Sequence, residues 1–167
     1  MRAILLVGGT GTRMGTLTID TPKANLLYKS QPLICHFLDL MLTQDSIEEV
    51  AIATGYRGDD VERMLTTTKF LPRNDVNMVS FPSVKGTLSR LMTMISTIGS
   101  STDTVALGID SLVPHKVLRI FLLWLENNPH SPALLLSPHL DIAPTHPKVK
   151  VEGENVTEYL RSTYEEG

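Results

Sequence analysis

The sequence predicts an α/β protein with a Rossmann-like, doubly wound and mostly parallel sheet flanked by helices. Short apolar runs alternate with segments of helical spacing along the 167 residues, the order that builds parallel sheets with right-handed crossovers. Polar or glycine-rich residues also follow three of the apolar runs, at residues 8–13, at Gly86 and at Asp110. Carboxyl ends of parallel strands share one edge of a sheet, where ligands bind. The same pattern therefore predicts the fold and a place for a site.

Composition narrows the class of protein. The chain is 42% hydrophobic and 20% charged, which is ordinary for one globular domain of this length, and we expect residues 1–167 to form one domain. A net charge of −3 gives no basic surface for nucleic acid or an anionic membrane. The single cysteine, Cys35, falls in an apolar run and predicts a buried thiol. No leader or long apolar span is apparent, so we expect a cytoplasmic protein.

The first half of the chain alternates predicted strands and helices. Buried strands are expected at 3–7 and 50–54, and a weaker third strand at 76–81. A short strand is expected at 26–28, and helices from Pro32 to Met41 and from Asp59 to Leu65. Pro32 suits a first helical turn. The acids Asp59 and Asp60 suit the positive end of the second helix.

The second half continues the alternation. A helix is expected to open at Gly86-Thr87, with a core stripe of Leu88, Leu91, Met92 and Ile95. A strand at 104–109, a helix at 114–125 and a strand at 133–136 follow. Residues 138–147 are rich in proline and predict irregular structure, and 148–151 with 156–159 predict a hairpin.

The loop after the first strand has the chemistry of a polyphosphate pocket. Its residues are Val7, Gly8, Gly9, Thr10, Gly11, Thr12 and Arg13. Three glycines within four positions let backbone N–H groups turn toward one point. Arg13 and, ten residues later, Lys23 supply charges that neutralise phosphate oxygens. The spacing matches neither the dinucleotide fingerprint nor the Walker A loop, and a glycine-rich turn alone is a weak signal.

The longer string narrows the interpretation. Gly8-Gly9-Thr10-Gly11-Thr12-Arg13-Met14, then Leu17-Thr18, Pro22-Lys23 and Pro32-Leu33-Ile34, resembles the signature of the sugar-1-phosphate nucleotidyltransferases. The resemblance implies transfer of an NMP group from an NTP to a sugar 1-phosphate or similar phosphate acceptor, with release of pyrophosphate. It implies that Arg13 holds the departing phosphates and that Lys23 stabilises charge on the α-phosphate or the acceptor.

Asp110 ends the strand predicted at 104–109. An acid there is often only an Asx turn or a helix N-cap. Gly108-Ile109-Asp110 also resembles the family position whose aspartate holds catalytic Mg²⁺. One fixed carboxylate facing a triphosphate suits a cation that takes its other ligands from phosphate and water.

The segment from Phe81 to Thr87 resembles the family segment that contacts the base, with Gly86 and Thr87 as its nucleotide-binding positions. Gly86 also fits a plain helix N-cap. Phe81 stands where related enzymes often place a base-reading glutamine. Its ring could stack on a base but has no group that hydrogen bonds to one, so the sequence does not identify the base.

Two departures from the family pattern concern the acceptor side. No second metal-binding aspartate follows a late strand, and Leu160-Arg161-Ser162 replaces the expected Glu-Lys-Pro element. These departures predict a compact or truncated acceptor part. They leave open a catalytically inactive domain that binds nucleotide or a regulatory partner, and a compact guanylyl- or cytidylyltransferase that uses a non-sugar phosphate. A homo-oligomer is also left open.

Overall fold

The structure is a computed structural model of the chain, and it describes residues 1–99, 102–109, 113–129, 133, 148–153 and 155–160. The chain divides into two compact units, Met1–Pro132 and Ala133–Gly167. The first unit contains the sheet and the candidate site.

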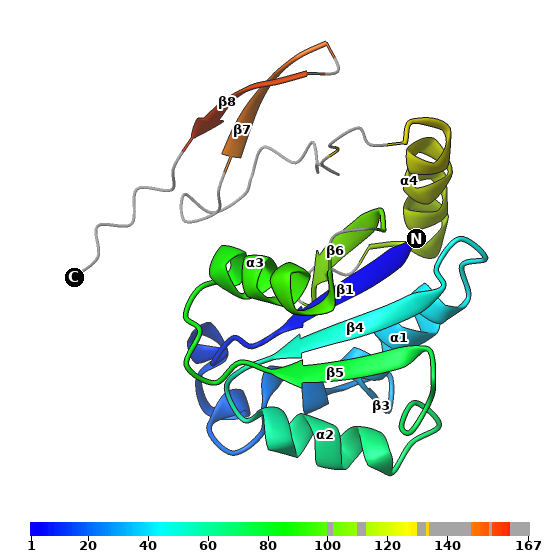
Figure 1. The fold of residues 1–167 in the computed structure, drawn as a ribbon. Coiled ribbons are helices and arrows are strands. Elements are labelled where there is room, and N and C mark those ends of the chain that lie inside the picture. The colour runs from blue at the N-terminus through cyan, green and yellow to red at the C-terminus, as the bar shows by residue number, and fades with distance from the viewer. Residues whose placement is uncertain (100–101, 110–112, 130–132, 134–147, 154, 161–167) are drawn as a thin grey trace. The chain divides into compact units, whose positions relative to one another are not determined.

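The centre of the first unit is a four-stranded parallel sheet (Figure 1). Its strands are β1 (Arg2–Val7), β4 (Glu49–Thr54), β5 (Val76–Ser80) and β6 (Thr104–Gly108), in the order β5-β4-β1-β6. The chain moves outward from β1 to β4 and β5 and then returns to the other side of β1 with β6. The order therefore reverses between β1 and β6, and this confirms the doubly wound, Rossmann-like prediction.

Four helices surround this sheet within the described ranges: α1 (Leu33–Leu42), α2 (Gly58–Thr66), α3 (Thr87–Ile98) and α4 (His115–Asn127). The predicted helices are confirmed with small shifts at their ends. Pro32 precedes α1 as its N-cap, in an extended conformation, and not as its first turn. None of these helices is long and apolar enough to cross a membrane.

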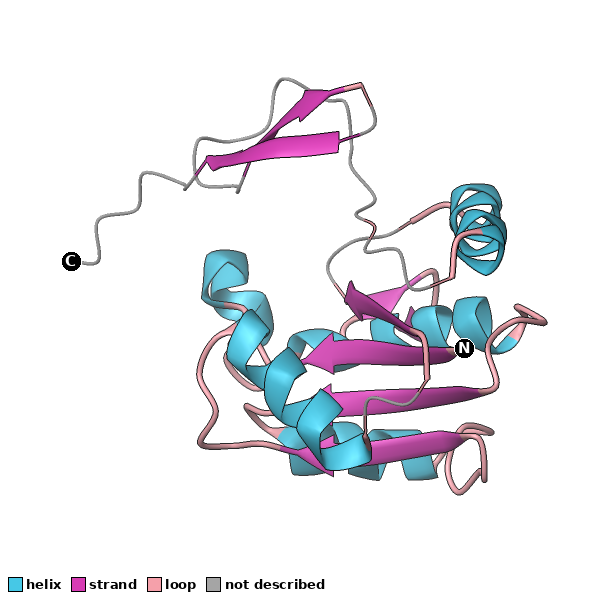
Figure 2. Ribbon diagram, turned by 45° about the horizontal axis from the view of Figure 1, so that its top comes forward, coloured by secondary structure: helices cyan, strands magenta, loops and turns pink. Residues whose placement is uncertain are grey.

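The two faces of the sheet are packed differently. One face lies against α1, α2 and α4, and alternate residues of the strands, such as Leu5 and Ile52, join its large apolar core. Figure 2 shows α3 crossing the other face. That core is smaller, with Ile4, Ala51, Ala53 and Met94 as its buried members. Alternation along each strand sends successive side chains to opposite faces, so one strand serves both cores.

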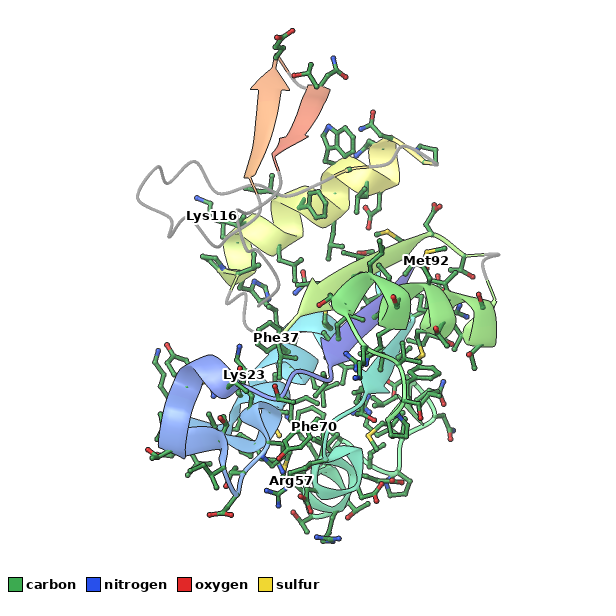
Figure 3. The ribbon with its side chains drawn as sticks, turned by 90° about the vertical axis from the view of Figure 1, so that its left-hand side faces the viewer. Lys23, Phe37, Arg57, Phe70, Met92 and Lys116 are labelled. Carbon is green, nitrogen blue, oxygen red and sulfur yellow. The ribbon has the colours of Figure 1, made fainter. Side chains whose placement is uncertain are left out.

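The interior of the large face contains two aromatic side chains. Phe37 on α1 is 1% exposed and Phe70, after α2, is 2% exposed (Figure 3). Cys35 is also buried, as predicted. Burial and the nearby Asp39 carboxylate raise the pKa of its thiol, which keeps it protonated and unreactive.

The predicted core stripe of α3 is wrong in part. Leu91 and Ile95 pack against the small core, but Leu88 is 70% exposed and Met92 57% exposed. The side chains that point into the sheet are instead Arg90 and Met94. The reason is the neighbouring strand: Ala51 and Ala53 are small, so they leave room for long side chains from one turn of the helix.

The second unit contains an antiparallel hairpin of β7 (Lys148–Glu152) and β8 (Asn155–Leu160). The hairpin predicted at these residues is confirmed, with a register shift between Lys150 and Val151. The strand predicted at 133–136 and the irregular segment at 138–147 lie outside the described residues, apart from Ala133.

Candidate functional site

The carboxyl ends of the four strands meet at one edge of the sheet. Val7 is opposite Thr54, Thr54 is opposite Ser80, and Leu6 is opposite Gly108. The loop after β1 and the segment after β5 both leave from this edge (Figure 1). The loop at residues 8–13 and the segment that leads to Gly86 therefore both begin at the same edge of the sheet.

The glycine loop follows β1, and several of its backbone N–H groups have no acceptor among the described residues. Val7 is buried, whereas Gly9, Thr10 and Thr12 are exposed. Among the described residues, the amides of Gly8, Gly9 and Thr10 donate to no protein group. Backbone N–H groups left open at the end of a central strand can bind an anion.

The far side of the loop is fixed by Gly11. Its φ of 70° lies in the left-handed region, which glycine adopts without strain. The Gly11 carbonyl accepts from the amide of Met14 at 2.8 Å and from the Thr18 hydroxyl at 2.9 Å. A Cβ at Gly11 would lie 2.8 Å from Thr18 Cγ2. The chain then enters a 3₁₀ segment, η1 (Thr12–Thr18), so Arg13 stands at the start of η1, and its side chain lies outside the described part.

Lys23 begins a second 3₁₀ turn, η2 (Lys23–Asn25), directly after the buried Pro22. η2 leads to the short strands β2 (Leu27–Tyr28) and β3 (Gln31–Pro32), which pair antiparallel. Asn25 ties η2 to α2, because its side-chain amide donates to the Asp60 carbonyl at 3.0 Å. The segment that presents Lys23 is therefore held against a helix of the large face.

Arg57 ties η1 to the same helix. It caps α2 in a left-handed conformation with φ 53°, and its Nη1 donates to the Ile19 carbonyl at 3.3 Å. Its Nε donates to the Asp60 carboxylate, and this hydrogen bond lowers the pKa of that carboxyl. A surface depression of about 380 Å³ lies beside these contacts, lined by Asp20, Thr21, Pro22, Asn25, Arg57, Asp60, Arg63, Met64 and Thr67.

The segment after β5 lies at the same edge of the sheet as the end of β4. The amide of Phe81 donates to the Thr54 carbonyl at 3.0 Å, which holds it beside the end of β4. Phe81 is half-buried and packs against the small core. Gly86, with φ 85°, caps α3, and Thr87 begins the helix. Both are exposed, and their predicted role in nucleotide binding stays a prediction.

Arg90 contacts both the glycine loop and the segment after β5, and it was not among the residues predicted from the sequence. It is 8% exposed, and its Nη2 donates to the Val84 carbonyl at 2.7 Å. A Cβ built on Gly8 would lie 2.2 Å from Arg90 Cζ, and one on Gly55 would lie 2.5 Å from Nη2. The guanidinium therefore lies against the glycines that follow β1 and β4. The available signal was an arginine at helical spacing with Met94 on the inner side of α3.

The predicted metal ligand cannot be placed. Asp110 lies outside the described residues, and the chain is described up to the buried Ile109, one position before it. In the ranges that are described, no group of three or more His, Cys, Asp or Glu side chains could hold a metal ion. The magnesium site at Asp110 therefore stays a prediction from the sequence.

The sequence is similar to those of known nucleotidyltransferases. The curated relatives include the catalytic subunit beta of a mannose-1-phosphate guanylyltransferase from Drosophila melanogaster, 38% identical over 64 residues. A protein of Arabidopsis thaliana assigned as a mannose-1-phosphate guanylyltransferase is 34% identical over 113 residues. These matches cover 38% and 68% of this chain but only 17% and 28% of the relatives.

Solved structures share the fold. A protein of Bacillus anthracis assigned as a glucose-1-phosphate thymidylyltransferase has a TM-score of 0.79 at 21% identity, over 97% of this chain and 64% of its own. A UDP-glucose pyrophosphorylase in complex with UDP-glucose has a TM-score of 0.75 at 17% identity, over 96% of this chain and 68% of its own. The sequence model of the nucleotidyl transferase family matches residues 2–123. This match spans the sheet, the glycine loop and α3, and the chain belongs to the nucleotidyl transferase family.

Proposed function

We propose that the protein transfers an NMP group from an NTP, with GTP as the preferred donor, to mannose 1-phosphate or a similar phosphate monoester. The observation that carries the proposal is the open loop after β1, where the amides of Gly8, Gly9 and Thr10 have no acceptor in the described part. The choice of GTP and mannose 1-phosphate is supported by the names of the relatives that are 34–38% identical.

In the proposed reaction a phosphate oxygen of the acceptor attacks the α-phosphorus of the NTP. The new P–O bond forms as the bond to the bridging β-oxygen breaks, and pyrophosphate leaves with that electron pair. Such chemistry depends on positioning and charge neutralisation more than on covalent help. The loop amides and Arg13 would hold the leaving phosphates. Lys23, fixed on η2, would stabilise charge on the α-phosphate or the acceptor.

Asp110 would hold Mg²⁺ in this proposal. The bound ion would supply neutralisation of the phosphate charge. The rest of the catalysis is assigned to the chain's own groups: amides that orient the phosphates, and two cations that hold them in line.

The test measures pyrophosphate release with Mg²⁺, each NTP in turn, and a panel of phosphate monoesters that includes mannose 1-phosphate. We expect release only when one NTP and one acceptor are both present. Arg13→Ala and Asp110→Ala should each lower the rate about 10²–10³-fold, because each removes a group that stabilises charge in the transition state.

Matched controls separate this loss from a general effect of charge. Arg119→Ala on α4 and Asp45→Ala after α1 change exposed residues and should leave the rate unchanged. NTP binding without pyrophosphate from any acceptor would contradict the transferase proposal and favour a catalytically inactive nucleotide-binding domain.

A further inference from the structure

Arg90 is a buried cation that the proposed transfer does not use. Its guanidinium lies against the backbones of Gly8 and Gly55, and a Cβ on either glycine would come within 2.6 Å of guanidinium atoms. The space at the ends of β1 and β4 is therefore occupied by a planar group that only glycine backbones permit.

The guanidinium has more donors than the protein satisfies. Nη2 donates to the Val84 carbonyl at 2.7 Å, but Nε is buried and has no partner among the described residues. Nη1 makes no hydrogen bond in the described ranges. A buried donor without an acceptor costs stability, and native proteins contain few of them unless the group has a task. The donors lie beside Gly8, the first residue of the loop that would bind the triphosphate.

We propose that Arg90 is a specificity-determining residue that donates to a nucleobase with two adjacent acceptor atoms, namely O6 and N7 of guanine. The proposal rests on the proposed function, because it concerns the nucleotide held at the same glycine loop. Only the tip of a flexible side chain contacts the two glycines, so a small rotation brings its free donors to an entering base.

Burial favours a base over a phosphate as the group that Arg90 binds. The exposed amides of Gly9 and Thr10 meet a phosphate at the surface, where its charge stays hydrated. Arg90 is only 8% exposed as a residue, and it lies on the inner side of α3 with Met94 of the small core. A planar, mostly apolar base loses little on entering such a place, whereas a multiply charged phosphate loses its hydration.

The donor pattern favours guanine over adenine and uracil. Cytosine also has two adjacent acceptors, O2 and N3, and the choice of guanine over cytosine is supported by the guanylyltransferase relatives. A guanidinium is donor-only, and its fork matches the O6 and N7 acceptors of guanine. Adenine presents N7 beside an amino donor, which the fork rejects. Uracil has a donor N–H between its two carbonyls, so it offers no adjacent pair. Phe81, half-buried at the same edge, can add a stacking surface but no hydrogen bond, so Arg90 supplies what Phe81 lacks.

The experiment measures equilibrium binding of GTP, ATP, CTP, UTP and inorganic tripolyphosphate to the full chain by calorimetry. We expect the wild type to bind GTP about 10-fold or more tighter than ATP. Arg90→Lys keeps the charge but loses the fork, so it should abolish most of this preference. Arg90→Gln should move the preference toward ATP, because a glutamine amide pairs with adenine N6 and N7.

Arg119→Gln is the matched control, since Arg119 is exposed on α4, and its affinities should equal those of the wild type. A cooperative thermal melting transition of each variant is the test that the variant is folded. Equal weakening of all four NTPs and of tripolyphosphate in Arg90→Lys would assign Arg90 to a phosphate and overturn the proposal. Unchanged affinities with a lowered melting temperature would show a purely structural arginine, and tighter binding of CTP than of GTP would overturn the guanine assignment.

The same data keep this proposal separate from the transferase proposal. GTP preference without pyrophosphate release would remove the transferase and leave the role of Arg90 standing. Transfer activity with equal binding of all four NTPs would overturn the role of Arg90 and leave the transferase proposal standing. Failure of the wild type to bind any nucleotide would overturn both.

Discussion

The two faces of the sheet use the same strands for different purposes. The face under α1, α2 and α4 has a large, continuous apolar core in which Phe37, Leu38 and Met41 are at most 1% exposed. The face under α3 has a small core, with two alanines and a buried arginine. This difference indicates that the large face provides most of the stability. The small face has less apolar packing and contains the Arg90 guanidinium beside the glycine loop.

The largest effect is expected on the large face. Phe37→Ala removes a side chain that is 1% exposed, and we expect it to destabilise the fold by about 3–5 kcal/mol. Urea denaturation followed by circular dichroism measures the change. Leu27→Ala is the control, because Leu27 is 72% exposed and its truncation should cost little.

The same truncation on the small face should cost less. Met94 is fully buried, but the core around it contains few buried side chains, so its truncation removes fewer packing contacts. We expect Met94→Ala to cost about 2–3 kcal/mol, measured in the same urea experiment. A loss equal to that of Phe37→Ala would contradict the division of roles between the faces.

The fold was predictable because its signals are local. Apolar runs such as 3–7 and 50–54 have strand length, and the helices between them have regular spacing, so order and type followed from the sequence. The glycine loop was predictable for the same reason, since its chemistry lies in consecutive residues. Arg90 was not, because its environment depends on Gly8 and Gly55, which are 82 and 35 positions away. The spacing of Leu88 and Met92 predicted a core stripe, but α3 buries Arg90 and Met94 instead and leaves Leu88 and Met92 exposed.

A third test adds a methyl group on the small face, where Gly55 lies against the Arg90 guanidinium. In Gly55→Ala the new Cβ would lie 2.5 Å from Arg90 Nη2, so the guanidinium must shift. Because the atoms in contact are the end of a flexible side chain, we expect a cost of about 1 kcal/mol, at the low end for overpacking. Thermal melting measures it, and Arg90→Lys in the same chain should relieve part of the cost.

Gly9→Ala is the matched control for that test. A Cβ on Gly9 meets nothing within 4 Å, so the substitution should leave stability unchanged. If Gly9→Ala destabilised the fold as much as Gly55→Ala, the contact with Arg90 would not explain the effect.

The smallest effect is expected at the solvent side of the large face. The hydrogen bond from Arg57 lowers the pKa of Asp60, so the folded pKa lies below the unfolded value of about 3.9. The stabilisation is therefore present above the unfolded pKa and is lost as pH falls through the folded one. Asp60→Asn should lower the melting temperature by about 2 °C or less at pH 7, because ion pairs at the surface contribute little even when they are half-buried, as Arg57 and Asp60 are. The difference between variant and wild type should vanish in melts at pH values below the folded pKa, and a difference that persists there would show that the Asp60 charge is not its source.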